Sequence, residues 1–174
     1  MKKIFLMLAA IVLISSCKDK DQETDILPEA TQSGKNTGGA IVDGKVWVAK
    51  IEAPSSTPGG NNTNYTNTGN KFNLEITLRE YNNETSLIKL YVNDVQHLSP
   101  KTYSISPLQN FEGYYTTSNY VKYDITQSTG GSITITNFDF FNQVVSGTFS
   151  FKAENLNGEI INVTDGRFDK KYSQ

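Results

Sequence analysis

From residue 40 onward, apolar residues recur at every second position along much of the chain. This spacing predicts β-strands that each bury one face. The alternation is clearest in residues 72–79, 88–92, 121–125, 132–136 and 145–152. No segment after residue 17 shows the 3.6-residue apolar stripe of an amphipathic helix, so the expected fold class is all-β.

Short turn motifs separate the predicted strands. Asp43-Gly44 lies between apolar residues, and Asn157-Gly158 leads into residues 159–164. Both dipeptides favour tight hairpins because they adopt positive φ angles readily. Asp165-Gly166 predicts a further turn or a bulge. Short strands punctuated in this way favour an antiparallel β-sandwich or a partly open barrel over residues 40–174.

Residues 54–70 interrupt the alternation. The segment is rich in Pro, Gly, Asn and Thr, and Tyr65 is its one large apolar residue. This composition predicts a long loop, and long loops in compact domains are either functional or disordered.

The first sixteen residues have the order of a secretory signal peptide. A basic start is followed by an uncharged apolar run from Ile4 to Ile14 and then by Ser15 and Ser16. The run is about half the length that a membrane-spanning helix needs. The sequence Ile14-Ser15-Ser16-Cys17 resembles the lipobox of bacterial lipoproteins. The resemblance implies cleavage between Ser16 and Cys17, with lipid on Cys17. Two or three acyl chains on one residue give stable membrane anchoring.

Residues 17–39 are predicted to form the lipidated cysteine and a disordered tether, because they are polar and have no sustained apolar period. Lys18 follows the cysteine, whereas Asp at that position retains enterobacterial lipoproteins in the inner membrane. The outer membrane is therefore expected. Residues 18–23 also resemble the charged export tag of surface lipoproteins from Bacteroidota. We expect the cell surface, with the periplasmic face as the alternative.

Charge and residue counts exclude several function classes. The chain has 16 Lys and Arg against 18 Asp and Glu, and removal of the signal peptide lowers the basic count to 14. No concentrated basic patch is present, so we expect no nucleic-acid partner. The one Lys pair after the signal peptide, Lys170-Lys171, is expected to be solvated. Cys17 and His97 are the sole residues of their types, which excludes an internal disulfide and multi-histidine metal sites.

Candidate catalytic residues do not form a recognisable motif. His97 lies near Asp94 and many serines, but no Gly-x-Ser-x-Gly elbow is present to expose a nucleophile. Glycosidases need two carboxylates at a defined separation, and the spacing of the acidic residues selects no pair. The carboxylates available are those of Glu75, Glu80, Glu84, Glu112 and Asp124. We therefore expect a protein that is not an enzyme and that uses no metal or cofactor.

The richest candidate for a binding surface is residues 111–120. Here Tyr114, Tyr115 and Tyr120 lie among Gly, Thr, Ser and Asn. Tyrosine rings beside small polar side chains suit wet recognition of a sugar or a partner protein. The alternative is that the rings close one end of the hydrophobic core.

Three motifs resemble a family of small, uncharacterised lipoproteins from Bacteroidota. They are residues 41–47, which read IVDGKVW, residues 147–151, which read GTFSF, and residues 163–168, which read VTDGRF. The resemblance implies an all-β domain on the outer membrane and supplies no activity and no catalytic residues.

These observations together predict a lipid-anchored outer-membrane protein that acts as a non-catalytic binding module for a glycan or an envelope protein. One alternative is an assembly component of an envelope complex. A second is a hydrolase whose site the sequence does not reveal. The sequence leaves the oligomeric state open.

Overall fold

The computed structural model describes residues 26–50, 63–68, 71–82, 84–95, 98–106 and 111–173. These residues form eleven strands. In chain order the strands are β1 (Thr37–Val42), β2 (Lys45–Val48), β3 (Thr63–Thr68), β4 (Lys71–Asn82), β5 (Glu84–Val95), β6 (Lys101–Ile105), β7 (Phe111–Thr116), β8 (Lys122–Asp124), β9 (Gly131–Asp139), β10 (Val144–Glu154) and β11 (Ile160–Lys171). Within the described ranges, no helix is long and apolar enough to cross a membrane.

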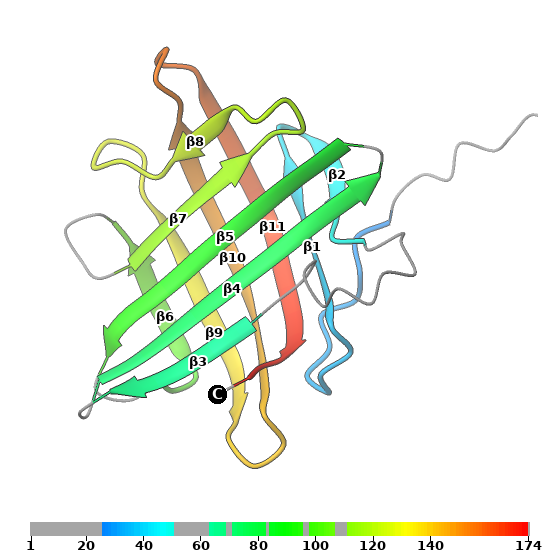
Figure 1. Cartoon of the computed structure of the whole chain (residues 1–174), viewed down its shortest axis with the longest axis vertical. Coiled ribbons are helices and arrows are strands. Elements are labelled where there is room, and N and C mark those ends of the chain that lie inside the picture. The colour runs from blue at the N-terminus through cyan, green and yellow to red at the C-terminus, as the bar shows by residue number, and fades with distance from the viewer. Residues whose placement is uncertain are drawn as a thin grey trace, which may run out of the picture.

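The strands form one antiparallel sheet that curls into an open half-barrel. Its hydrogen-bonded order is β2-β1-β11-β10-β8-β7-β5-β4-β3, and β9 and β6 branch from β10. In Figure 1, β3, β4, β5 and β7 form a front layer that crosses the layer of β1, β9, β10 and β11. A parallel bridge between Asn64 and Ser173 joins the β3 edge to the end of the chain. The predicted all-β, partly open architecture is confirmed.

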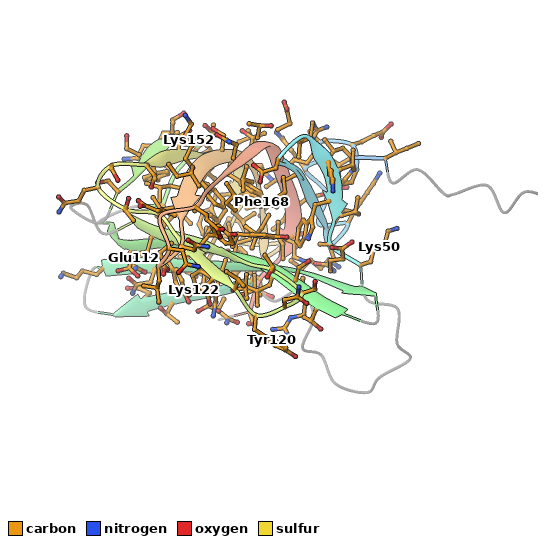
Figure 2. All side chains as sticks on the ribbon, turned by 90° about the horizontal axis from the view of Figure 1, so that it is seen from above. Lys50, Glu112, Tyr120, Lys122, Lys152 and Phe168 are labelled. Atoms are coloured by element: carbon orange, nitrogen blue, oxygen red, sulfur yellow. The ribbon has the colours of Figure 1, made fainter. Side chains whose placement is uncertain are left out.

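The core fills the space between the two layers with the inward residues that the alternation predicts. Figure 2, viewed from above, places Phe168 between the layers. The fully buried side chains come from both layers and include Leu74, Ile76, Leu78, Ile88, Leu90, Val92, Ile133, Ile135, Val145 and Val163. The Trp47 indole also crosses the core, and its Nε1–H donates a buried hydrogen bond of 2.7 Å to Ser86 Oγ. Apolar burial thus holds the two layers together.

The predicted turn residues adopt the expected backbone conformations. Asp43 and Gly44 have φ angles of 46° and 80° and join β1 to β2 in a two-residue hairpin. Gly158 has a φ of 79° in the turn that joins β10 to β11. Asp165 has a φ of 50° and lies at a register shift between β11 and both of its neighbours, so Asp165-Gly166 forms a bulge rather than a turn.

Three sequence predictions are wrong in part. Residues 63–68 of the predicted loop form β3, and Tyr65 is buried against the rings of Phe72, Phe138 and Tyr172. The rest of that loop, residues 51–62, 69 and 70, lies outside the described residues. Lys170 is not solvated but 0% exposed. Lys170 follows the buried Phe168 by two positions on β11, so the two side chains point to the same, inward side of the sheet.

The third correction concerns the tether, which was predicted to extend to residue 39. Residues 31–36 instead lie along the domain. The backbone N–H groups of residues 33–35 donate to the Asp169 carboxylate, and Asn36 Oδ1 accepts from the Lys171 N–H. β1 then begins at Thr37. A single carboxylate with several donors can order a polar segment that has no apolar period. Residues 1–25, which contain Ser16 and Cys17, lie outside the described residues.

Candidate functional site

The side of β3, β4, β5 and β7 that points away from the core, here called the outer face, carries polar and aromatic residues in cross-strand rows. One row runs through Asn64, Glu75, Tyr91 and Glu112, which are register partners on four neighbouring strands. The next row contains Lys89, whose register partner on β7 is Tyr114. Period-two alternation places these residues on the face opposite the buried leucines and isoleucines of the same strands.

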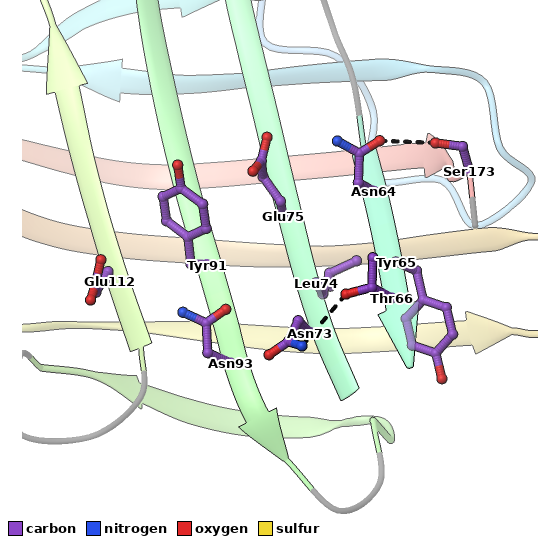
Figure 3. A pocket seen from close by; sticks show the side chains of 10 residues that line it. All are labelled: Asn64, Tyr65, Thr66, Asn73, Leu74, Glu75, Tyr91, Asn93, Glu112 and Ser173. Atoms are coloured by element: carbon purple, nitrogen blue, oxygen red, sulfur yellow. Dashed lines mark hydrogen bonds between the residues drawn. The ribbon is translucent and has the colours of Figure 1, made fainter. Parts of the chain in front are cut away.

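A shallow depression of about 730 Å³ lies over the first row. Figure 3 shows the side chains that line it, among them the buried Tyr65 and Leu74. The polar lining is dominated by amides, hydroxyls and carboxylates. It comprises Asn64, Thr66, Asn73, Glu75, Tyr91, Asn93, Glu112 and Ser173. Two hydrogen bonds fix parts of the rim, Ser173 Oγ to Asn64 Oδ1 at 2.9 Å and Asn73 Nδ2 to Thr66 Oγ1 at 3.5 Å.

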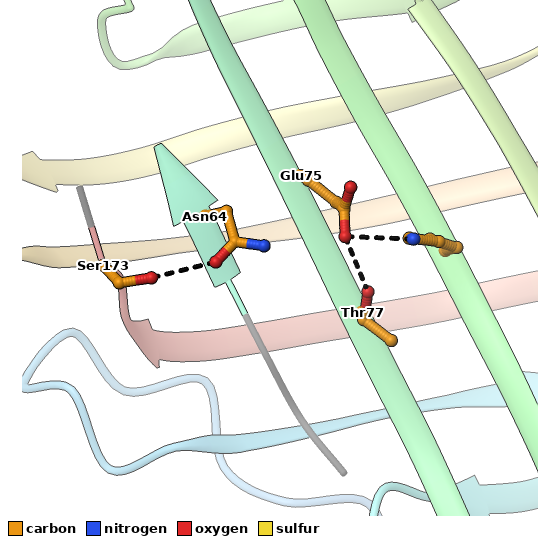
Figure 4. A network of polar contacts seen from close by, with 5 residues as sticks. Asn64, Glu75, Thr77 and Ser173 are labelled. Carbon is orange, nitrogen blue, oxygen red and sulfur yellow. Dashed lines mark hydrogen bonds and ion pairs between the residues drawn. The ribbon is translucent and has the colours of Figure 1, made fainter. Parts of the chain in front are cut away.

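An ion pair and hydrogen bonds hold the centre of the outer face in place. Lys89 Nζ lies 3.0 Å from Glu75 Oε1, and Thr77 Oγ1 donates to the same oxygen at 3.4 Å (Figure 4). Lys89 also hydrogen-bonds to Tyr91, and Tyr91 hydrogen-bonds to Tyr114. The network therefore runs across β4, β5 and β7 and fixes the direction of both tyrosine rings.

Partial burial and hydrogen bonding set the ionisation states in this network. Burial lowers the pKa of Lys89, but its hydrogen bonds to Tyr91 and Glu75 and the charge of Glu75 together raise the pKa above its usual value. Burial, with Tyr91 as a secondary cause, raises the pKa of Tyr114. Lys89 is therefore a cation and Tyr114 a neutral hydroxyl at neutral pH.

A second cation lies over the Tyr114 ring. Lys122 Nζ is 4.4 Å from the ring centroid and 2.6 Å from Asp124 Oδ1. Lys89 Nζ similarly lies 5.3 Å from the Tyr91 centroid. Both rings thus make cation–π contacts, which restrict ring motion at a half-exposed position.

The three tyrosines predicted as a binding surface do not converge. Tyr114 lies on the outer face. Tyr115 points to the other side of β7, where it packs against the core with its ring 6.4 Å from that of Tyr123. Burial also raises the pKa of Tyr115. Tyr120 lies in the β7–β8 turn, with a φ of 63° and 82% of its surface exposed. Adjacent strand residues point to opposite faces, so Tyr114 and Tyr115 cannot share one surface.

The other sequence candidates fall into two groups. His97, and the side chains of Glu84 and Asp94, lie outside what the structure describes. Of the predicted carboxylates, Glu75 and Glu112 both line the depression. Glu80 instead accepts a hydrogen bond at 2.9 Å from Ser86, which in turn accepts one from Trp47. Among the described side chains, no three His, Cys, Asp or Glu residues gather in a way that could hold a metal ion.

Sequence reasoning missed Lys89 and Tyr91 as site residues. The alternation of β5 did place them opposite Ile88 and Leu90, so the signal for outward exposure was present. Their partners Glu75 and Tyr114 come from strands that are separate in the sequence. Only the register of β4, β5 and β7 brings the four residues together.

Comparison with known proteins gives a family but no activity. Residues 39–170 match the model of a family described as "Domain of unknown function (DUF6252)". The match begins within β1, ends near the end of β11 and includes every strand of the outer face. No curated protein and no solved structure matches the chain.

Proposed function

Since the chain belongs to the DUF6252 family, whose description assigns no function, we propose a function from its own residues. In this proposal the protein is a lipid-anchored, non-catalytic module of the bacterial outer membrane that binds a glycan on the outer face of its sheet.

The outer-face network carries this proposal. Tyr91 and Tyr114 present two rings whose orientations are fixed by Lys89, Glu75 and the neighbouring strands. Sugar rings have apolar C–H faces that pack on aromatic rings, and their hydroxyl groups both donate and accept hydrogen bonds. A tyrosine surface bordered by amides, hydroxyls and carboxylates offers complementary groups for each of these features.

Charge favours an uncharged glycan over an anionic one. Among the residues that the structure describes, those that line the depression include Glu75 and Glu112 but no lysine or arginine. The nearest cation of the network, Lys89, is already paired with Glu75 at 3.0 Å. A phosphate or carboxylate entering the depression would meet Glu112 without a lysine or arginine in the lining to pair with it.

The same carboxylates argue for binding rather than hydrolysis. An inverting glycosidase needs one protonated carboxylic acid and one carboxylate on opposite sides of the scissile bond. The Glu75 carboxylate is already engaged on the sheet, because Oε1 lies 3.0 Å from Lys89 Nζ and accepts a hydrogen bond from Thr77 Oγ1 at 3.4 Å. Neither carboxylate is enclosed, since the depression is shallow and Glu112 is exposed.

The anchor rests on the sequence. The basic start, the short apolar run and Ser15-Ser16-Cys17 support cleavage before Cys17 and acylation of its thiol. Eight residues, 18–25, separate the cysteine from Ile26, the first residue that the structure describes. A domain on such a tether stays close to its membrane. The charged run in residues 18–23 supports display on the cell surface.

Glycan binding is tested by screening the mature protein against a panel of neutral and acidic oligosaccharides and measuring affinities by calorimetry. Tyr91→Ala is expected to weaken binding of the best ligand at least about tenfold, which corresponds to about 1.4 kcal/mol. Tyr120→Ala is the matched control, because it removes an exposed tyrosine from the β7–β8 turn, away from the depression. It should leave the affinity unchanged.

Three results would contradict the proposal. Equal losses of affinity in Tyr91→Ala and Tyr120→Ala would show that the outer face is not the binding site. Release of shorter sugars during the titration would replace the binding module with a hydrolase. A failure of every oligosaccharide to bind, together with a stable complex with an envelope protein, would favour the assembly role.

Protease shaving of intact cells tests the location. The native protein should be membrane-bound and cleaved from outside, and Cys17→Ala should leave the membrane fraction. Protection of a membrane-bound native protein would place the domain in the periplasm.

A further inference from the structure

The turn between β9 and β10 exposes two adjacent phenylalanines. Phe141 is 96% exposed and Phe140 is 53% exposed, and their rings meet edge to face with centroids 6.3 Å apart. The turn forms one pole of the molecule, at the bottom of Figure 1. Two large apolar rings at a hairpin tip lose the free energy that burial would provide, so their exposure calls for an apolar partner.

Hydrogen bonds and a ring contact hold the conformation of the β9–β10 turn. The Asp139 carboxylate accepts hydrogen bonds from the N–H groups of Phe141 and Asn142, at 3.0 and 2.9 Å, and from Asn142 Nδ2 at 2.7 Å. The Phe140 ring contacts Tyr65 edge-on, with centroids 6.4 Å apart. Because the turn is fixed from both sides, Phe141 points outward without having to be ordered when a partner arrives.

Exposed lysines lie beside the tip. Val144, the first residue of β10, pairs with Asp139 on one side and with Lys171 on the other. The Lys171 side chain is exposed, as is that of Lys35, which lies next to Gly34. An ideal Cβ on Gly34 would lie 2.9 Å from Val144 and 3.0 Å from Lys171, so this segment packs directly on the base of the hairpin. Apolar rings bordered by lysines match an interface in which acyl chains lie beneath charged headgroups.

The N-terminal segment passes this pole on its way from the predicted anchor into β1. Asn137, three residues before Phe140, donates from its Nδ2 to the Gln32 carbonyl oxygen at 3.5 Å. The chain passes the base of the β9–β10 hairpin at Gln32, and further back it lies against β11, where the Arg167 guanidinium donates to the Pro28 carbonyl oxygen at 3.3 Å. Nine peptide steps from Cys17 to Ile26 span at most about 30 Å, so the domain cannot move far from the bilayer.

We propose that Phe140 and Phe141 insert into the lipid interface beside the acyl anchor and fix the orientation of the domain on the membrane. The proposal rests on the lipid anchor of the proposed function but does not depend on the glycan. With this pole in the membrane, the β10–β11 turn at the opposite pole points away from it (Figure 1).

Fluorescence quenching in proteoliposomes tests the insertion. Acylated full-length mature protein carrying Phe141→Trp is reconstituted into phosphatidylcholine vesicles whose acyl chains are brominated near the headgroup. Leu156→Trp is the matched control, because Leu156 is also fully exposed and lies in the β10–β11 turn. The native Trp47 is buried in the core and gives the background in both variants.

Phe141→Trp is expected to lose at least half of its added emission in brominated vesicles and to shift to shorter wavelength, whereas Leu156→Trp should show neither change. Absence of quenching in Phe141→Trp, or equal quenching in the two variants, would overturn the proposal.

The mass of the purified protein shows whether Cys17 is acylated, and so distinguishes a missing anchor from a tip that does not insert. Without acyl groups on Cys17 the anchor is refuted and the tip proposal fails with it. An acylated protein whose Phe141→Trp emission is unquenched refutes the tip alone.

Discussion

Replacement of Asp169 by asparagine tests how one carboxylate holds the N-terminal segment on the domain. Asp169 is 1% exposed and accepts five hydrogen bonds. Its donors are the hydroxyls of Thr31 and Ser146, at 2.6 and 2.8 Å, and the N–H groups of residues 33–35, at 2.7 to 3.1 Å. Burial alone would raise the Asp169 pKa, but these bonds lower it from 3.8 to about 2.

The expected loss follows from the geometry. Asparagine keeps the shape but presents an NH₂ group where an acceptor is needed. In one orientation of the side-chain amide, the NH₂ group faces the Gly34 N–H. In the other orientation, it faces the N–H groups of Ser33 and Lys35. The pKa depression corresponds to about 2.5 kcal/mol of unfolding free energy, and one charge-assisted hydrogen bond is worth about 1.5 to 3 kcal/mol. We expect Asp169→Asn to lose about 2 to 4 kcal/mol at pH 7.

Urea unfolding between pH 7 and pH 2 measures this loss and its sign. A carboxyl whose folded pKa is lowered stabilises the protein fully above its unfolded pKa, near 4, and loses that contribution as the pH falls toward 2. The difference between wild type and Asp169→Asn should therefore shrink from pH 5 to pH 2. Hydrogen exchange at residues 33–35 should also become faster in the variant.

Asp165→Asn is the matched control on the same strand. Asp165 is exposed and has a φ of 50°, which asparagine tolerates equally well, so the change should stay within about 0.5 kcal/mol. A loss below 1 kcal/mol in Asp169→Asn, or unchanged exchange at residues 33–35, would show that the carboxylate does not hold the segment.

Two further predictions concern the core. Burial lowers the pKa of Lys170 to about 8, with the nearby Asp169 charge opposing the shift, so the unfolded chain binds more protons between about pH 8 and 10. Wild-type stability should rise over that interval by up to about 3 kcal/mol relative to Lys170→Met, and parallel pH profiles in urea would contradict this. Trp47→Phe removes the bond from Nε1 to Ser86 and should cost about 1 to 3 kcal/mol by circular dichroism. Ser86→Ala should lower the unfolding free energy less in the Trp47→Phe variant than in the wild type. Strictly additive losses in the double variant would argue against the hydrogen bond.

The sequence predicted the fold class because local rules decide it. Alternation along β4, β5 and β10 is set by the pleat of a strand and does not depend on the partner strand. Asp43-Gly44 formed a two-residue hairpin because positive φ angles are a local preference of those residues. The prediction failed for β3, because its polar residues resemble a loop. What holds β3 is its pairing with β4 and the burial of Tyr65.

The candidate site was predictable only in part. The sequence analysis predicted Tyr114 and Tyr115 on one binding surface, although adjacent residues of a strand point to opposite faces. Glu75 was noted as a carboxylate without a partner, and Lys89 and Tyr91 were not singled out. The contact between these residues depends on register, which is set by how whole strands pack and leaves no local mark in the sequence.

By itself the sequence determined the all-β class, the hairpin turns and the apolar positions of the core, because each follows from neighbours a few residues apart. Only the tertiary structure decided that Asp169 orders residues 31–36, that Lys170 points inward and that three strands assemble one network on the outer face. Each of these features joins residues that are distant in the chain. Their energy comes from hydrogen bonds and burial that exist only after the sheet has formed.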